Sequence, residues 1–264
     1  MQDNLPSPLL CGLLDLAIEA GKAVMAVYLH ETDTRWKADA TPVTAADLTA
    51  ENIILAGLAK LAPAIPVVSE ESAAAGFVPT LGHRFFLVDP LDGTKEFLAR
   101  NGEFTVNIAL IEYFTPLCGI VFAPALPRLF WAESDKGAFE AAVSSDGKLV
   151  NPAFRRLSAS PLPSTGLRVV ASRSHRDALT EEWLKSCDIG KLVCAGSSLK
   201  FCLIATGEAD IYPRFGRTME WDTAAGHAIL SVAGGKVLTD DKKPLTYGKV
   251  AERFANPSFI ASGP

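Results

Sequence analysis

The chain has 264 residues, enough for one large or two modest domains with a buried core. Its hydrophobic content of 48% and charged content of 21% are typical of a compact globular protein and exclude a disordered chain. The net charge of -5 disfavours a nucleic-acid-binding surface, which requires a basic footprint, but it is compatible with a nucleotide-sized ligand.

The five cysteines are scattered, with no Cys-x-x-Cys pair, and predict reduced thiols in a cytoplasmic protein. Residues 1–4 lack the basic region of a signal peptide, and no apolar run approaches the length of a membrane span. We expect a cytoplasmic location, with peripheral attachment to the cytoplasmic side of the inner membrane as the alternative. The sequence does not distinguish a monomer from a homodimer.

The first predicted elements are two helices. Ser7 followed by Pro8 is typical of a helix cap and a first helical position, and apolar residues then recur at helical spacing as far as Val27. A second helix is predicted over 47–61. Short strands are predicted at 65–68 and 85–88. Beyond them, apolar runs at 104–111, 117–122 and 129–131, separated by proline and glycine, predict an antiparallel meander. Residues 139–163 are expected to be irregular.

A connector rich in proline and serine, near 152–163, is expected to join two halves, 1–157 and 158–264. The second half alternates between strands and helices, which indicates a layered α/β unit. Its strands are predicted over 167–171, 191–195 and 209–212, and its helices over 177–187, 197–206 and 222–233. The fold class is therefore α/β, with an α+β N-terminal half.

The chain is organised around the apolar run 85–88, which ends in two acids three residues apart, Asp89 and Asp92. Gly93 is expected to adopt a positive φ or to allow a close approach, and Thr94 to begin a short helix whose free N–H groups attract anions. Two hard oxygen ligands beside such a helix start indicate a site for magnesium and phosphate. Taken alone, the pattern is equally typical of a hairpin turn followed by a capped helix.

Further acids lie where predicted strands end or helices begin. The strand 65–68 runs into Glu70 and Glu71, and acids at the end of an apolar strand must be solvated or bound to a cation. Asp47 and Asp222 fall at helix starts, where capping alone would account for them. Because two predicted strands both end in acids, the pattern favours a metal site over a hairpin turn with a capped helix.

In order along the chain, these motifs resemble the lithium-sensitive, magnesium-dependent phosphatases of the inositol monophosphatase superfamily. The motifs are Ser69-Glu70-Glu71, Asp89-Pro90-Leu91-Asp92-Gly93-Thr94 and Trp221-Asp222-Thr223-Ala224-Ala225-Gly226. Within the superfamily the chain is most similar to the bacterial 3'(2'),5'-bisphosphate nucleotidases of the CysQ type, through residues 41–47, 92–97, 101–109, 172–175, 196–200 and 212–214. The resemblance covers nearly the whole chain and implies a layered α/β/α/β/α sandwich with its site between the two halves.

The resemblance also implies roles for individual residues. Two to three Mg2+ ions would be held by Glu70, Asp89, the Leu91 carbonyl, Asp92 and Asp222. Asp47 and Thr94 would orient a water and accept its proton, with Glu70 as a third catalytic residue. The substrate would contact Gly93, Thr94, Ser174, His175, Ser197, Lys200, Arg214 and Asp222.

Arg214 is the residue that most directly indicates the substrate. At the matching position, inositol monophosphatases have a glutamate that accepts hydrogen bonds from sugar hydroxyls, whereas a cation suits a second phosphate. The expected reaction is hydrolysis of the 3'-phosphate of adenosine 3',5'-bisphosphate to AMP, with 3'-phosphoadenylyl sulfate as a further substrate. The alternatives are an inositol or sugar phosphate monophosphatase and a non-catalytic regulator that binds magnesium or a nucleotide.

Overall fold

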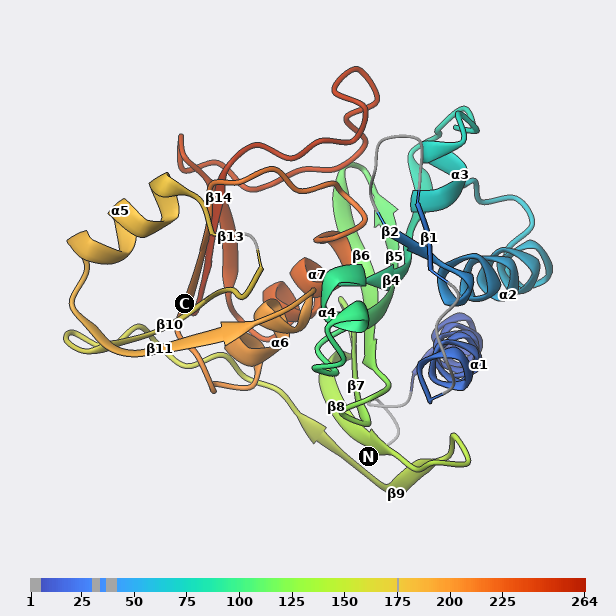
Figure 1. The fold of residues 1–264 in the computed structure, drawn as a ribbon, viewed down its shortest axis with the longest axis horizontal. Helices are drawn as coiled ribbons and strands as arrows, with labels where there is room; N and C mark the ends of the chain where they lie inside the picture. The colour runs from blue at the N-terminus through green and yellow to red at the C-terminus, as the bar shows by residue number, and fades with distance from the viewer. Residues whose placement is uncertain (1–5, 30–33, 37–41, 175) are drawn as a thin grey trace.

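The computed structural model describes residues 6–29, 34–36, 42–174 and 176–264. Its elements stack in five layers, in which helices alternate with two sheets (Figure 1). Helices α1 (Pro8–Leu29) and α2 (Ala45–Leu61) cover the outer face of the larger sheet, and α6 (Leu199–Ala205) and α7 (Ala224–Val232) lie between the sheets. Helix α5 (Ala178–Ser186) packs on the outer side of the smaller sheet. The predicted α/β/α/β/α sandwich is confirmed.

The larger sheet has the strand order β3-β4-β5-β6-β7-β8-β9. Strand β3 runs parallel to β4, and every later neighbour is antiparallel, as the predicted meander requires. The strands are β3 (Val67–Ser69), β4 (Arg84–Asp92), β5 (Thr105–Glu112), β6 (Thr115–Ala123), β7 (Arg128–Glu133), β8 (Gly137–Val143) and β9 (Leu149–Arg156). Parallel pairing of β3 with β4 brings the ends of both strands to the same edge of the sheet.

The prediction that residues 139–163 are irregular is wrong for their first half, because β8 and β9 occupy most of it. Phe139, Ala141 and Val143 are buried, while Glu140 between them is partly exposed, which is the alternation of a half-buried strand. The short run and the polar residues that interrupt it hide that period in the sequence. We keep the division of the chain at 157/158 as a proposal.

The smaller sheet has the order β11-β10-β12-β14-β13. Its predicted strands are present as β10 (Leu167–Ser172), β11 (Ile189–Ala195) and β12 (Ile211–Arg214), all parallel. Two antiparallel strands that were not predicted, β13 (Lys236–Thr239) and β14 (Phe259–Ser262), complete it. A separate pair, β1 (Thr34–Trp36) and β2 (Pro42–Thr44), precedes α2.

Three hydrophobic clusters hold the layers of the described chain together. One fills the space beneath α1 and α2, and a second fills the space between the sheets around Phe201 and Phe259. The third, around Val169, Leu184 and Ile211, packs α5 on the smaller sheet. Each large apolar side chain removed from water contributes roughly 1.5–3 kcal/mol. The predicted cap of α1 is confirmed, because the Leu10 N–H donates to Ser7 Oγ at 3.1 Å. No described helix has the length and apolar character needed to cross a membrane.

Candidate active site

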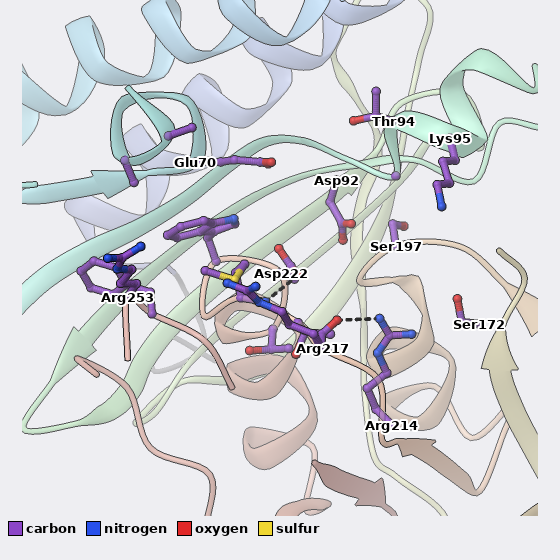
Figure 2. Close-up of a pocket in the computed structure, with 18 of the residues that line it drawn as sticks. Glu70, Asp92, Thr94, Lys95, Ser172, Ser197, Arg214, Arg217, Asp222 and Arg253 are labelled. Carbon is purple, nitrogen blue, oxygen red and sulfur yellow. Dashed lines mark hydrogen bonds between the residues drawn. The ribbon is translucent and has the colours of Figure 1, made fainter. Parts of the chain in front are cut away.

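A cleft of about 820 Å³ opens between the two sheets. Glu70, Asp92 and Asp222 lie across its middle (Figure 2). To one side of these acids are Lys95, Ser172, Ser197 and Arg214 (Figure 2), which together with Lys200, whose Nζ donates to the Ser197 carbonyl, we call the proximal arm. To the other side is Arg253 (Figure 2). We define the distal arm as Arg253, the cleft-lining residues Val250 and Phe254 of the same segment, and Trp221, whose ring centre lies 5.9 Å from that of Phe254.

The acids reach the cleft because two parallel strands end side by side. Ser69 at the end of β3 pairs with Val88 of β4, so Glu70 and Asp89 follow at the same sheet edge. Glu70 begins the short helix α3 (Glu70–Ala74), and Asp92 ends β4. Asp47 joins them from the first turn of α2, where it is 1% exposed. The structure therefore brings together the acids predicted from separate motifs.

These carboxylates lie close enough to affect one another strongly. Desolvation raises the pKa of Asp89 well above its usual value, and the negative charges of Glu70, Asp92, Asp222 and Asp47 raise it further. Desolvation also raises the pKa of Asp222 well above its usual value, with Asp92 and Glu70 as further causes. The pKa of Asp92 is raised by desolvation too, against the opposing charge of Lys200. Such a cluster needs compensating positive charge to stay ionised at neutral pH.

The donor set fits magnesium, a hard cation that binds oxygen ligands and is usually held by one or two carboxylates together with waters and substrate phosphate. The described acidic side chains do not converge on one point, since no three of the described His, Cys, Asp or Glu residues form a closed metal-binding group. The fit is therefore one of donor chemistry: hard oxygen ligands, buried or half-buried and mutually repelling, beside an open cleft. A cation among them would supply the attraction that their charges lack.

The bend after Asp89 has the geometry expected of it. A register shift interrupts the pairing of β4 with β5 between Asp89 and Asp92, and the Leu91 N–H donates to Asp89 Oδ1 at 3.1 Å. Gly93 adopts φ 92°, and a Cβ there would lie 3.2 Å from the Glu103 carbonyl oxygen. The predicted positive φ is confirmed. Thr94 begins α4 (Thr94–Leu98) and donates from Oγ1 to the Leu91 carbonyl at 3.5 Å.

Asn107 and Ser198 join the acids of the two halves, a role that the sequence analysis assigned to neither. Asn107 Nδ2 donates to Asp92 Oδ2 at 3.2 Å and to Ser198 Oγ at 3.1 Å. The Ser198 N–H donates to Asp92 Oδ2 at 2.6 Å, and its Oγ donates to the Asp222 carbonyl at 2.5 Å. The one signal in the sequence was an asparagine inside the apolar run of β5.

The proximal arm carries two buried cations. Lys200, 5% exposed, donates from Nζ to the Ser197 carbonyl and lies 5.2 Å from the Tyr212 ring centre. Desolvation lowers the pKa of Lys200 to about 8, although the charge of Asp92 opposes the shift. Arg214, 8% exposed, donates from Nη2 to the Arg217 carbonyl at 2.9 Å. Both predicted cations therefore face the same space as the acids (Figure 2 labels Arg214).

The other predicted contacts differ in their surroundings. Ser197 lines the cleft with φ 47°, and its buried Oγ has no hydrogen-bond partner within the described chain. Ser174 donates from Oγ to Glu96 Oε1 at 2.5 Å, so an intramolecular bond already occupies its hydroxyl proton. Arg173 is bound by Glu103 through two hydrogen bonds of 2.7 and 2.8 Å. His175 lies outside the described residues.

Comparisons with known proteins agree with this arrangement. A family model described as the inositol monophosphatase family matches residues 5–262. The chain is 47% identical over 249 residues to the 3'(2'),5'-bisphosphate nucleotidase CysQ of Shigella flexneri, covering 94% of this chain and 96% of that protein. It resembles the crystal structure of CysQ from Bacteroides thetaiotaomicron, with a TM-score of 0.79, 37% identity and 96% of each chain covered. It also resembles an inositol monophosphatase structure from Thermotoga maritima, with a TM-score of 0.77, 25% identity, and 96% of this chain and 91% of that chain covered.

Proposed function

We propose that this chain, which belongs to the inositol monophosphatase family, is a 3'(2'),5'-bisphosphate nucleotidase. Relatives with that name align with it over 94% of its length at up to 47% identity. The observation that carries the proposal is the pairing, in one cleft, of a repelling carboxylate cluster with the buried cations Lys200 and Arg214. The reaction is hydrolysis of the 3'-phosphate of adenosine 3',5'-bisphosphate to AMP and phosphate, with 3'-phosphoadenylyl sulfate as a further substrate.

In this proposal, two to three Mg2+ ions bind among Glu70, Asp89, the Leu91 carbonyl, Asp92 and Asp222. Bound Mg2+ neutralises the acids, polarises the phosphoryl group and lowers the pKa of water. The family is generally metal-dependent, and the identity and number of the ions are part of the proposal. The contacts that Asp92 receives from Asn107 and Ser198 orient its carboxylate towards the cleft.

The chain's own residues have three tasks in the reaction. Asp47, buried beside Asp89, accepts a proton from the attacking water, and the Thr94 hydroxyl helps to orient that water. The N–H groups of Gly93 and Thr94 bind phosphoryl oxygens. Glu70, which also lines the cleft, completes the set of acids around the reacting phosphate.

The proximal arm binds the rest of the nucleotide. Arg214 and Lys200 provide positive charge for the second phosphate, and Ser197 has a buried hydroxyl directed at the same arm. Ser174, His175 and Asp222 stay predicted contacts of the substrate. A neutral polyol offers no second phosphate for Arg214 and Lys200 to bind, which disfavours inositol phosphates.

Phosphate release tests the proposal. Equal concentrations of adenosine 3',5'-bisphosphate, inositol 1-phosphate and fructose 1,6-bisphosphate would be supplied with Mg2+, with and without lithium. We expect strong preference for the nucleotide, and we expect Arg214→Glu to lower kcat/KM for it more than for inositol 1-phosphate. Lys236→Glu makes the same charge reversal on β13, outside the cleft, and should leave the preference unchanged.

The alternatives predict other outcomes. Preference for inositol or sugar phosphates would assign the chain to the monophosphatases of the same family. No release from any substrate would favour a non-catalytic regulator, which has no need of Asp47 and Thr94. A cytoplasmic location and a monomeric or dimeric state stay predictions, and peripheral membrane attachment has no support in the described structure.

A further inference from the structure

The proposed function uses the acids and the proximal arm and leaves the distal arm without a role. The cleft, at about 820 Å³, is near the upper end of the range of about 300–1,000 Å³ typical of small-molecule sites. Figure 2 shows Arg253 at the opposite side of the acids from Arg214 and Ser172. A second ligand therefore has room beside a substrate bound in the proximal arm.

The walls of the distal arm are apolar and aromatic. Val250 is 50% exposed and faces the cleft. Trp221 and Phe254 also line the cleft; they are 7% and 3% exposed, with ring centres 5.9 Å apart. An exposed apolar side chain together with packed aromatic rings forms a surface that a flat apolar group can cover.

The backbone that builds this arm adopts an unusual conformation. Arg253 and Phe254 have φ values of 51° and 62°, in the left-handed region that residues with side chains rarely occupy. Two hydrogen bonds hold the segment: Phe254 N–H to the Lys249 carbonyl at 2.9 Å, and Glu220 N–H to the Phe254 carbonyl at 2.8 Å. The conformation places Phe254 in the core and leaves Arg253 at the cleft. Strain of this kind persists only where the surroundings enforce it, and it often accompanies a binding site.

Glu220 anchors the same segment from below. It is fully buried, and its two carboxylate oxygens accept the N–H groups of Gly248 and Lys249 at 2.7 and 2.8 Å. Lys249 Nζ adds an ion pair at 2.8 Å. The wall that carries Val250 and Arg253 is therefore fixed to the residue two positions before Asp222, so the arm is a built part of the cleft.

Arg253 differs from Arg214 and Arg173 in its partners. Arg214 donates to the Arg217 carbonyl, and Arg173 is bound by Glu103. Within the described part of the chain, no acidic side chain lies within ion-pair distance of Arg253. Its guanidinium, which offers five N–H donors, faces the cleft next to the apolar walls.

From this juxtaposition we propose that the distal arm is a second ligand site, which binds an aromatic anion while the substrate occupies the proximal arm. The ring covers Val250 and the edge of Trp221, and its acidic group binds the Arg253 guanidinium. A single negative charge suits the site better than two, because Glu70 and Asp222 lie between it and the proximal arm. The site stands independently of which phosphate ester the enzyme hydrolyses.

The test uses 1-naphthalenesulfonate, an aromatic monoanion that has no phosphate to hydrolyse. Calorimetric titration would be done on the full chain with Mg2+, with and without saturating inorganic phosphate, which fills the catalytic centre. We expect one site per chain with the same affinity in both conditions. Arg253→Gln should weaken binding about tenfold, the loss expected for a charge-assisted hydrogen bond.

Two further variants make the result specific. Val250→Glu places a negative charge on the apolar wall and should weaken binding at least as much as Arg253→Gln. Lys95→Gln removes one positive charge from the proximal arm and should leave the affinity unchanged. Absence of binding, displacement of the probe by phosphate, or equal weakening in Lys95→Gln and Arg253→Gln would each overturn the distal site. Since no turnover is measured, these outcomes are separate from the fate of the proposed reaction.

Discussion

Buried acids occur in two regions of this molecule, and their surroundings differ. In the cleft, Asp89 receives the N–H of Leu91 and otherwise faces neighbouring carboxylates, which raise its pKa. Outside that cluster, Glu220 is fully buried with three N–H donors, and Asp210, also fully buried, is bound by the Arg168 guanidinium. Acids saturated by donors hold loops in place, whereas acids that face one another need a cation. Mutating each kind should therefore separate stability from activity.

The largest expected effect is that of Asp89→Asn on activity. The substitution removes a charge at the centre of the cluster, where the metal ions are proposed to bind. Because metal ions supply several kcal/mol of transition-state stabilisation, kcat/KM should fall at least about 10³-fold. Phosphate release over a range of Mg2+ concentrations measures this loss.

Without metal, Asp89→Asn should be at least as stable as the wild type. An acid whose pKa is raised in the folded state destabilises the fold when it is ionised, so Asp89→Asn should match or exceed the wild type in EDTA. Added Mg2+ should raise the melting temperature of the wild type more than that of the variant. Strong destabilisation of the metal-free variant would show that Asp89 is an anchor like Glu220.

Asp47→Asn should lower kcat about 10²- to 10³-fold, the usual range for losing a general base. Its distinctive result is the response to metal, because Asp47 is not among the proposed ligands. The rise in melting temperature with Mg2+ should stay close to that of the wild type. If kcat is unchanged, or if the response to Mg2+ disappears, the role proposed for Asp47 is wrong.

Glu220→Gln should have the opposite profile. The carboxylate accepts three donors, and the amide that replaces it places an N–H group among them. Removing one partner from a buried charged network costs about 3–5 kcal/mol. Urea unfolding should show this loss in the free energy of unfolding. Asp222→Asn, two residues along the chain, is the matched control, because it should lose activity with a smaller change in stability.

Most of the fold could be predicted because its longest elements carry local signals. Helix α1 has a cap and helical spacing, and β4 and β5 are uninterrupted apolar runs. Strands β13 and β14 have four residues each and owe their pairing to distant partners, such as Ile211 with Ser262. A strand of that length has no period of its own to detect.

The acids of the cleft could be predicted from the order of their motifs, but their neighbours could not. Ser198 and Asn107 meet across 91 positions of the sequence, and neither residue type indicates a site by itself. Arg253 lies in no recognised motif. Its position depends on the left-handed conformations of Arg253 and Phe254, which the sequence does not predict. Contacts of this kind follow from the folded chain, not from local pattern.

His227 extends the comparison to a buried base. It lies 2.9 Å from the Tyr247 hydroxyl, and desolvation lowers its pKa to about 4 from 6.5. The unfolded chain therefore binds the proton more readily, so stability is fully present above about pH 6.5 and is lost as the pH falls towards 4. A shift of this size corresponds to at most about 3 kcal/mol.

His227→Gln, which keeps a hydrogen-bonding group beside Tyr247, should remove that part of the pH dependence. The difference between wild type and variant in the free energy of unfolding should shrink between pH 7 and pH 4. Measuring the difference cancels the carboxylates that also titrate at low pH. A difference that stays constant over this range would mean that His227 is solvated.

The smallest expected effect concerns Ser197, and it separates a structural role from a substrate-binding role at one residue. Ser197 is left-handed, with φ 47°, and its buried hydroxyl has no partner within the described chain. Ser197→Gly relieves both costs and should raise the free energy of unfolding by about 1 kcal/mol. If the hydroxyl contacts the nucleotide, KM should rise for adenosine 3',5'-bisphosphate, while the KM for inositol 1-phosphate changes less. Ser197→Ala keeps the backbone strain and loses the hydroxyl, so it should reproduce the change in KM with less of the gain in stability. A stability gain without any change in KM would place Ser197 with the structural residues of the wall.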